Sequence, residues 1–237
     1  MKAYGLFPVL VAEFEYPYHA EFKQLFFQNM EKYAHSSGMN TEQGYIDLQT
    51  YPEFQPFYTF VATCAKEYVG QLGVDPDEWM YYIVKSWWNG MEQENIQMHS
   101  HCDAHLSFAY YLSTPPESNK LLFVAGKDYK NDLTNGMFME NYEDVSPVQE
   151  WNQFTPAQAF DAVEGKLMIF PSTLEHCTVP YDPYATEMNP GYDEPSVDPE
   201  ALKKLRISIA GDFLMTFKEP TSKALGIQPI EKWIRFS

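Results

Sequence analysis

Four potential metal ligands are concentrated in the stretch MHSHCDAHLS, residues 98–107. They are His99, His101, Asp103 and His105, at every second position. Residues i and i+2 of a strand point to the same face, so His99, His101 and Asp103 could project toward one point. Imidazole and carboxylate groups bind divalent transition metals, and the spacing therefore predicts a metal site.

A further ligand would have to come from a distant part of the chain. The best candidate is His176 in FPSTLEHCTVP, which follows the apolar run GKLMIF and a Pro-Ser-Thr bend. Two imidazoles and one carboxylate on one face of a metal leave the opposite positions open. This arrangement is typical of ferrous iron sites that activate oxygen, because a cosubstrate and O₂ both need vacant positions.

The run LRISIA supplies groups that could bind a carboxylate. Arg206 and Ser208 are two residues apart and share a strand face. The guanidinium group offers two parallel hydrogen bonds, and the hydroxyl group offers one more. Tyr110 and Tyr111, in the run that follows the histidines, offer phenol groups for the same purpose.

The composition indicates one globular domain and limits its partners. The 237 residues are 45% hydrophobic and 16% aromatic, which is enough for one substantial core. A formal net charge of −17 argues against binding to a nucleic-acid backbone or an anionic membrane. No stretch approaches the roughly 20 apolar residues of a membrane span. Three cysteines without CxxC spacing do not indicate a disulfide framework, so we expect a cytoplasmic protein.

The hydrophobic periodicity predicts a mainly β fold with flanking helices. After a short N-terminal strand, helices are expected over residues 20–34 and 56–73. From residue 79 onward, short aromatic and β-branched runs bounded by Gly, Pro, Asn and Asp predict the strands of an antiparallel sandwich or barrel.

The domain prediction is a single unit over residues 1–237. It consists of the N-terminal strand and helices over 1–78 and a β core over 79–237. Two long polar inserts interrupt this core, at 126–162 and at 181–203, and a short helix is expected near residues 156–163. Long inserts inside a compact β domain are usually functional loops or tethers.

Three segments, taken together, resemble a known family. They are SWWNGMEQENIQMHSHCDAHLSFAYYLSTP, GKLMIFPSTLEHCTVP and RISIAGDF. In order, they follow the pattern of the 2-oxoglutarate/iron(II)-dependent oxygenases of bacteria and phages. That pattern runs W-x-N, H-x-H, a strand ending in Tyr-Tyr-Leu, Gly-x-Leu-x-x-Phe-Pro with a distal histidine, and Arg-x-Ser. The likeness covers roughly residues 87–114 and 165–213 and a few N-terminal residues.

The resemblance implies a double-stranded β-helix of the jelly-roll or cupin type, with Fe²⁺ and 2-oxoglutarate as cofactors. His176 would be the distal metal ligand. Arg206 would bind the far carboxylate of 2-oxoglutarate, assisted by Ser208 and Tyr111. The implied enzyme is a dioxygenase that uses O₂ to hydroxylate an unknown small molecule or peptide, with release of succinate and CO₂.

The identity of the proximal ligands stays open at this point. The wider oxygenase superfamily uses His-x-Asp, which His101 and Asp103 provide, whereas closer relatives carry His-x-His, which matches His99 and His101. A carboxylate partly neutralises Fe²⁺, so chemistry favours His101 and Asp103. In a three-histidine site, Asp103 would instead accept a hydrogen bond from a ligand ring.

Three other functions also stay open, and one of them is a non-catalytic interaction module whose pocket binds a partner without a metal. HSHCDAH is close to the His-x-His-x-Asp-His signature of zinc hydrolases, although one residue separates Asp103 from His105. A cupin-type metal-dependent isomerase or binding protein would share the fold but would not need Arg206 and Ser208. An oxygen-activating centre must be shielded from water, so we expect residues 181–203 to form a lid or substrate-selecting loop.

Overall fold

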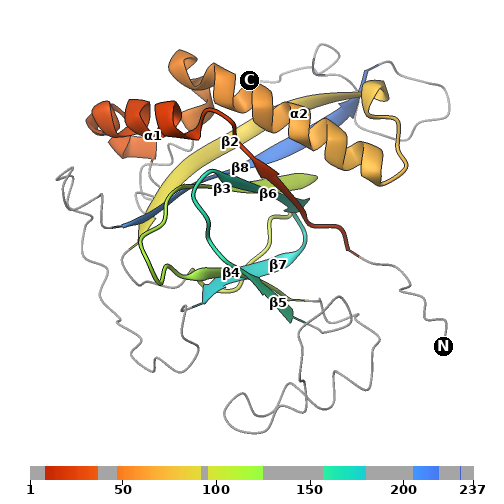
Figure 1. The fold of residues 1–237 in the computed structure, drawn as a ribbon. Coiled ribbons are helices and arrows are strands. Elements are labelled where there is room, and N and C mark those ends of the chain that lie inside the picture. The colour runs from red at the N-terminus through yellow and green to blue at the C-terminus, as the bar shows by residue number, and fades with distance from the viewer. Residues whose placement is uncertain are drawn as a thin grey trace, which may run out of the picture.

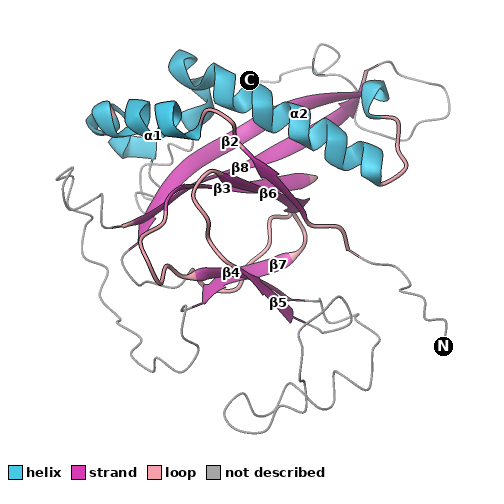
Figure 2. Ribbon diagram, viewed as in Figure 1, coloured by secondary structure: helices cyan, strands magenta, loops and turns pink. Residues whose placement is uncertain are grey.

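Two antiparallel sheets face each other, and two helices cover the outer face of the larger sheet (Figure 1). This is the arrangement in the computed structural model, which describes residues 9–36, 47–91, 96–124, 157–179, 205–218 and 230. Figure 2 shows the helices as one layer above the strands. The predicted class, mainly β with flanking helices, is confirmed.

The larger sheet has five strands in the order β1-β6-β3-β8-β2. Their bounds are β1 Ala12–Glu15, β2 Trp79–Met91, β3 Leu106–Ser113, β6 Lys166–Pro171 and β8 Arg206–Phe217. The smaller sheet has the order β5-β4-β7, with β4 Lys120–Val124, β5 Ala157–Phe160 and β7 Glu175–Val179. From β5 to β8, successive strands alternate between the two sheets, which is the connectivity of a double-stranded β-helix.

The helices form because their apolar residues recur at helical spacing. Helix α2, Gln55–Gln71, buries Phe57, Val61 and Tyr68 against the larger sheet. The helix expected over 20–34 is divided into α1, His19–Gln28, and a 3₁₀ helix, Met30–Ser36.

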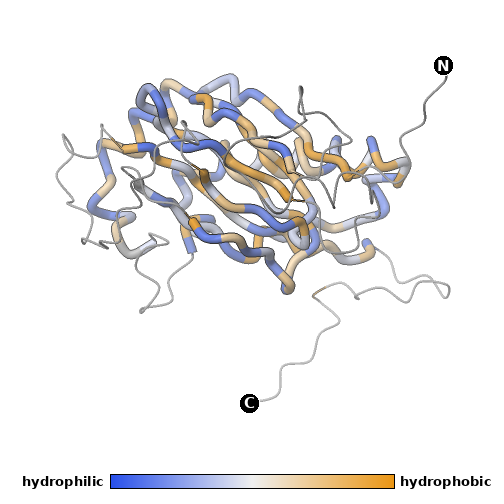
Figure 3. Tube along the Cα trace, turned by 90° about the horizontal axis from the view of Figure 1, so that it is seen from below, coloured by the Kyte–Doolittle hydropathy of each residue, from blue (hydrophilic) through white to orange (hydrophobic). Residues whose placement is uncertain are grey.

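The end of α1 has a local cause. The side chain of Asn29 donates a hydrogen bond to the Leu25 carbonyl at 2.9 Å, which competes with the regular backbone pattern. Figure 3 shows hydrophobic and hydrophilic residues interleaved along the described segments, as expected where each element has one buried face.

Residue alternation along β8 gives the strand two different faces. Ile207 and Ile209 belong to the main core beneath the helices. Ser208 and Asp212 therefore point to the opposite face, toward the smaller sheet. Ser208 lies opposite Tyr111 of β3, which packs between the two sheets. This inner cluster consists of Tyr111, Leu121, Phe123, Met168 and Phe170.

One local prediction is wrong, and others lie outside the described residues. The short helix expected near 156–163 is strand β5, which pairs with β4. A strand of four residues depends on its neighbour for hydrogen bonds, and that long-range pairing has no local signal. Residues 126–156 and 181–203 are not described, so the lid stays a prediction. Among the described residues, no helix has the length and apolar character needed to cross a membrane.

Candidate metal centre

The segment before β3 and strand β7 bring three histidines together. His99 and His176 form an antiparallel bridge, with backbone N–H to carbonyl distances of 3.0 and 2.9 Å. The backbone N–H of His101 donates to the Ser172 carbonyl at 2.8 Å. The segment therefore runs beside β7, and one ring nitrogen from each histidine lies within 4.8 Å of the other two. A distance of this size suits three ligands that share one cation.

Hydrogen bonds fix the orientation of all three imidazole rings. Nδ1 of His99 lies 2.8 Å from the Gln97 carbonyl, and Nδ1 of His176 lies 2.8 Å from the Leu174 carbonyl. A carbonyl oxygen only accepts, so both Nδ1 atoms carry the proton. In the neutral form of each ring, the lone pair is then on Nε2, the nitrogen that can bind a metal.

The third ring is held by a carboxylate. Nδ1 of His101 lies 2.8 Å from Oδ1 of Asp212, which also accepts a hydrogen bond from the Ser107 hydroxyl at 2.6 Å. Burial alone would raise the pKa of Asp212, but the hydrogen bonds from His101 and Ser107 and the nearby Lys85 ammonium lower it. Asp212 is therefore a carboxylate, and Nε2 of His101 is the nitrogen available to a metal.

His176 is the most buried member of this three-histidine cluster. Its ring packs beside Phe170 and Phe123, with centroid distances of 5.0 and 6.1 Å. Burial lowers the pKa of His176 to about 4, so the ring is neutral at physiological pH. A neutral imidazole in an apolar wall is suited to bind a cation, and it carries no charge that would repel one.

Asp103, which chemistry favoured as a ligand, is not part of the cluster. Its side chain is 70% exposed, and both carboxylate oxygens lie 3.0 Å from Nζ of Lys85. The chain bends at 102–103 and does not continue as a strand, so the every-second-residue alternation ends after His101. His105 is also separate, because its Nδ1 accepts the backbone N–H of Met215 at 2.9 Å.

The residues expected to bind 2-oxoglutarate lie together on the inner face of the larger sheet. Arg206, Ser208 and Tyr111 are all buried. The guanidinium carbon of Arg206 lies 5.2 Å from the centroid of the Tyr111 ring, and Tyr111 is paired with Ser208 across β3 and β8. Tyr110 points the other way and hydrogen-bonds to Nδ1 of His19 at 2.6 Å. Cosubstrate binding by these residues stays a prediction.

Sequence reasoning missed Asp212, which lies beside His101. Asp212 lies an even number of residues from Arg206 and Ser208 along β8, so all three side chains share one face of the strand. This alternation is the sequence signal that could have identified Asp212. Trp87 lies with its ring centroid 5.9 Å from that of His101, whereas Trp88 is buried in the main core. The tryptophan pair is therefore divided between the two faces of β2.

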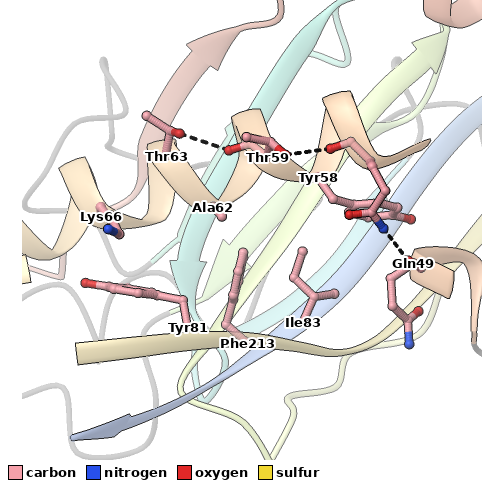
Figure 4. Close-up of a pocket in the computed structure, with 10 residues that line it drawn as sticks. Gln49, Tyr58, Thr59, Ala62, Thr63, Lys66, Tyr81, Ile83 and Phe213 are labelled. Atoms are coloured by element: carbon pink, nitrogen blue, oxygen red, sulfur yellow. Dashed lines mark hydrogen bonds between the residues drawn. The ribbon is translucent and has the colours of Figure 1, made fainter. Parts of the chain in front are cut away.

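A groove in the described part of the chain lies away from this cluster. Figure 4 shows it between α2 and the larger sheet, lined by Thr59, Thr63 and Lys66 from the helix and by Tyr81 and Phe213 from the strands. These residues lie on the helix side of the sheet. No histidine of the cluster lines the groove.

Comparisons with known proteins agree with this geometry. Residues 85–187, less than half of the chain, match the model of a family described as "Putative 2OG-Fe(II) oxygenase". This range includes all three clustered histidines but not Arg206 or Ser208. A search of curated proteins finds no match.

Three solved structures match this chain at low sequence identity. One is the non-heme alpha-ketoglutarate-dependent carbocyclase SnoK from nogalamycin biosynthesis, with 10% identity and a TM-score of 0.50 over 89% of this chain and 82% of that chain. A Pseudomonas putida prolyl-4-hydroxylase matches with 10% identity and a TM-score of 0.46 over 87% and 88%. A Burkholderia pseudomallei oxidoreductase of the 2OG-Fe(II) oxygenase family matches with 12% identity and a TM-score of 0.33 over 56% of this chain and 43% of that chain.

Fold and site together define a class. The chain is a double-stranded β-helix protein with three histidines that converge from the segment before β3 and from β7. The resemblance to the 2-oxoglutarate- and Fe(II)-dependent oxygenases, inferred from the sequence motifs, is confirmed by the family match.

Proposed function

We propose that this protein is an Fe(II)- and 2-oxoglutarate-dependent oxygenase that hydroxylates an organic substrate and releases succinate and CO₂. The observation that carries the proposal is the convergence of His99, His101 and His176, each with Nδ1 occupied by a separate acceptor. Three imidazoles fit Fe²⁺, which accepts nitrogen ligands and leaves its remaining positions for other groups.

The chain's own residues would bind and orient the reacting groups. The three histidines would hold Fe²⁺ through Nε2. Arg206 and Ser208 would bind the far carboxylate of 2-oxoglutarate, because a buried guanidinium provides a strong and directional partner for it. When bound, iron and 2-oxoglutarate together supply the oxidising chemistry that inserts one oxygen atom of O₂ into a substrate C–H bond.

The inner cluster of aromatic and aliphatic residues would exclude water from this space. Phe123 and Phe170 flank His176, so the metal would lie against an apolar wall. Excluding water strengthens the electrostatic interactions of the bound cosubstrate and limits side reactions. Trp87 lies on the same side and would face the substrate.

The geometry favours this function over a zinc hydrolase and over a cupin-type isomerase or binding protein. A zinc hydrolase of the His-x-His-x-Asp-His kind would need Asp103 and His105 at the metal, and the structure brings neither of them to the cluster. A cupin-type isomerase or binding protein gives no role to the buried arginine and serine of β8.

The test is an anaerobic titration with Fe²⁺ and then 2-oxoglutarate, followed by the visible charge-transfer absorption of the chelate. The intact protein should develop the band, and His176→Ala should not. Arg206→Lys should develop the band only at a 2-oxoglutarate concentration about 10- to 100-fold higher, because lysine cannot form both parallel hydrogen bonds of the guanidinium group to the carboxylate. An intact protein that binds Fe²⁺ but shows no band would contradict the proposal.

A further inference from the structure

We propose that Asp212 is a positioning residue of the metal centre, which fixes His101 and supplies the negative charge that the three histidine ligands lack. The inference rests on the proposed function only in requiring that the three histidines bind a metal. It assigns a role to a residue outside the region matched by the family model.

The surroundings of Asp212 are those of a fixed carboxylate. Its side chain is fully buried. Oδ1 accepts hydrogen bonds from Nδ1 of His101 at 2.8 Å and from the Ser107 hydroxyl at 2.6 Å. Oδ2 lies 3.0 Å from Nζ of Lys85. The carboxylate therefore has a partner on each side and cannot rotate without losing one of them.

The three histidines differ in the charge of the group that holds them. His99 and His176 donate to neutral backbone carbonyls, whereas His101 donates to a carboxylate. An anionic acceptor makes the ring a stronger electron donor and holds it in one tautomer. Many open iron sites include a carboxylate that binds the metal directly. Here, the carboxylate of Asp212 acts through the ring of His101.

Lys85 links this carboxylate to the surface. Its ammonium group lies 3.0 Å from Asp212 and 3.0 Å from Asp103, which is mostly exposed. Asp103 is thus three contacts away from His101 along this route, through Lys85 and Asp212, and solvent screens its effect. Asp212 is therefore a buried carboxylate in contact with a ligand ring, and Asp103 is a matched, mostly exposed carboxylate paired with the same lysine.

The experiment compares Asp212→Asn with Asp103→Asn in the full chain, using Co²⁺ as the spectroscopic probe. Asparagine keeps the size and an acceptor oxygen but removes the charge. We expect Asp212→Asn to weaken Co²⁺ binding by about 10- to 100-fold, and Asp103→Asn to change it by less than about threefold. Equal affinities for Asp212→Asn and the unchanged protein would overturn the proposal.

A second readout separates positioning from general destabilisation. The Co²⁺-loaded protein should show three shifted, exchangeable imidazole N–H resonances in its NMR spectrum. In Asp212→Asn only one of them should move, because His99 and His176 keep their carbonyl acceptors. Movement of all three, or of none, would contradict a specific role.

If Asp212→Asn does not fold, Ser107→Ala serves instead, since it removes one of the hydrogen bonds that hold Oδ1. It should weaken Co²⁺ binding by about two- to tenfold, and an unchanged affinity would overturn the inference. Failure of the unaltered protein to bind Co²⁺ through the histidines would instead contradict the proposed function itself.

Discussion

Adjacent residues on one strand can have entirely different roles, and Tyr110 and Tyr111 are the clearest example. Tyr111 packs with Arg206 between the sheets, and Tyr110 hydrogen-bonds to His19 beneath α1. Each phenol is buried, and burial raises both pKa values, so both are neutral at physiological pH. The two residues differ only in the side of β3 on which they lie.

The matched variants Tyr111→Phe and Tyr110→Phe should separate these roles. Tyr111→Phe should weaken 2-oxoglutarate binding by about 10- to 100-fold, because a hydrogen bond to a carboxylate is lost, with little change in Tm. Tyr110→Phe should lower the free energy of unfolding by about 1 kcal/mol, because Nδ1 of His19 loses this hydrogen bond, and leave 2-oxoglutarate binding unchanged. Calorimetry of cosubstrate binding and urea denaturation measure the two effects, and a reversed pattern would refute the assignment.

At the scale of the element, β8 matters most to the site. It carries Arg206 and Ser208 near one end and Asp212 further along, on one face, while its other face packs under the helices. It lies between β2 and β3 and pairs with both. A change in its register or spacing would therefore displace the groups proposed to bind 2-oxoglutarate and the carboxylate that holds His101.

Gly211 permits the close approach of β8 to its neighbours. A Cβ atom there would lie 2.6 Å from Cε1 of Phe108 and 2.7 Å from the Lys85 carbonyl. The backbone oxygen cannot move freely, so Gly211→Ala should destabilise the fold by about 1–3 kcal/mol. Gly70→Ala in α2 is the control, since nothing lies within 4 Å of its Cβ, and it should stabilise the protein by up to about 1 kcal/mol. Thermal unfolding measures both variants, and equal Tm values would contradict the packing argument.

At the scale of the whole molecule, metal binding should stabilise the fold. The cluster joins the segment before β3 to β7, and these parts are separated by about 75 residues of sequence. A ligand that binds only the folded state at 100 times its Kd adds about 2.7 kcal/mol. For a chain of this size, this corresponds to a Tm increase of about 5–11 °C.

The control for this prediction is His99→Ala. His99 is partly exposed, so its removal should not disturb the core, but the variant should lose most of the metal-dependent increase in Tm. Differential scanning calorimetry with and without Co²⁺ measures it. A full increase in the variant would show that the metal binds elsewhere.

The sequence by itself determined the class of fold and the types of group in the site. Strand alternation separates Ser208 from its apolar neighbours Ile207 and Ile209, and the order of motifs predicted that His176 would meet the histidine-rich segment. These features are local or follow from a fixed chain order, so they can be read without coordinates.

Only the tertiary structure decided which groups converge. The preference for Asp103 assumed that the strand continues past His101, but the chain bends there and Lys85 of β2 binds the carboxylate. Asp212 holds His101 from a strand more than 100 residues away. Such contacts depend on sheet pairing and on where a strand ends, because these fix the direction of each side chain, and neither is encoded in the local spacing of residue types.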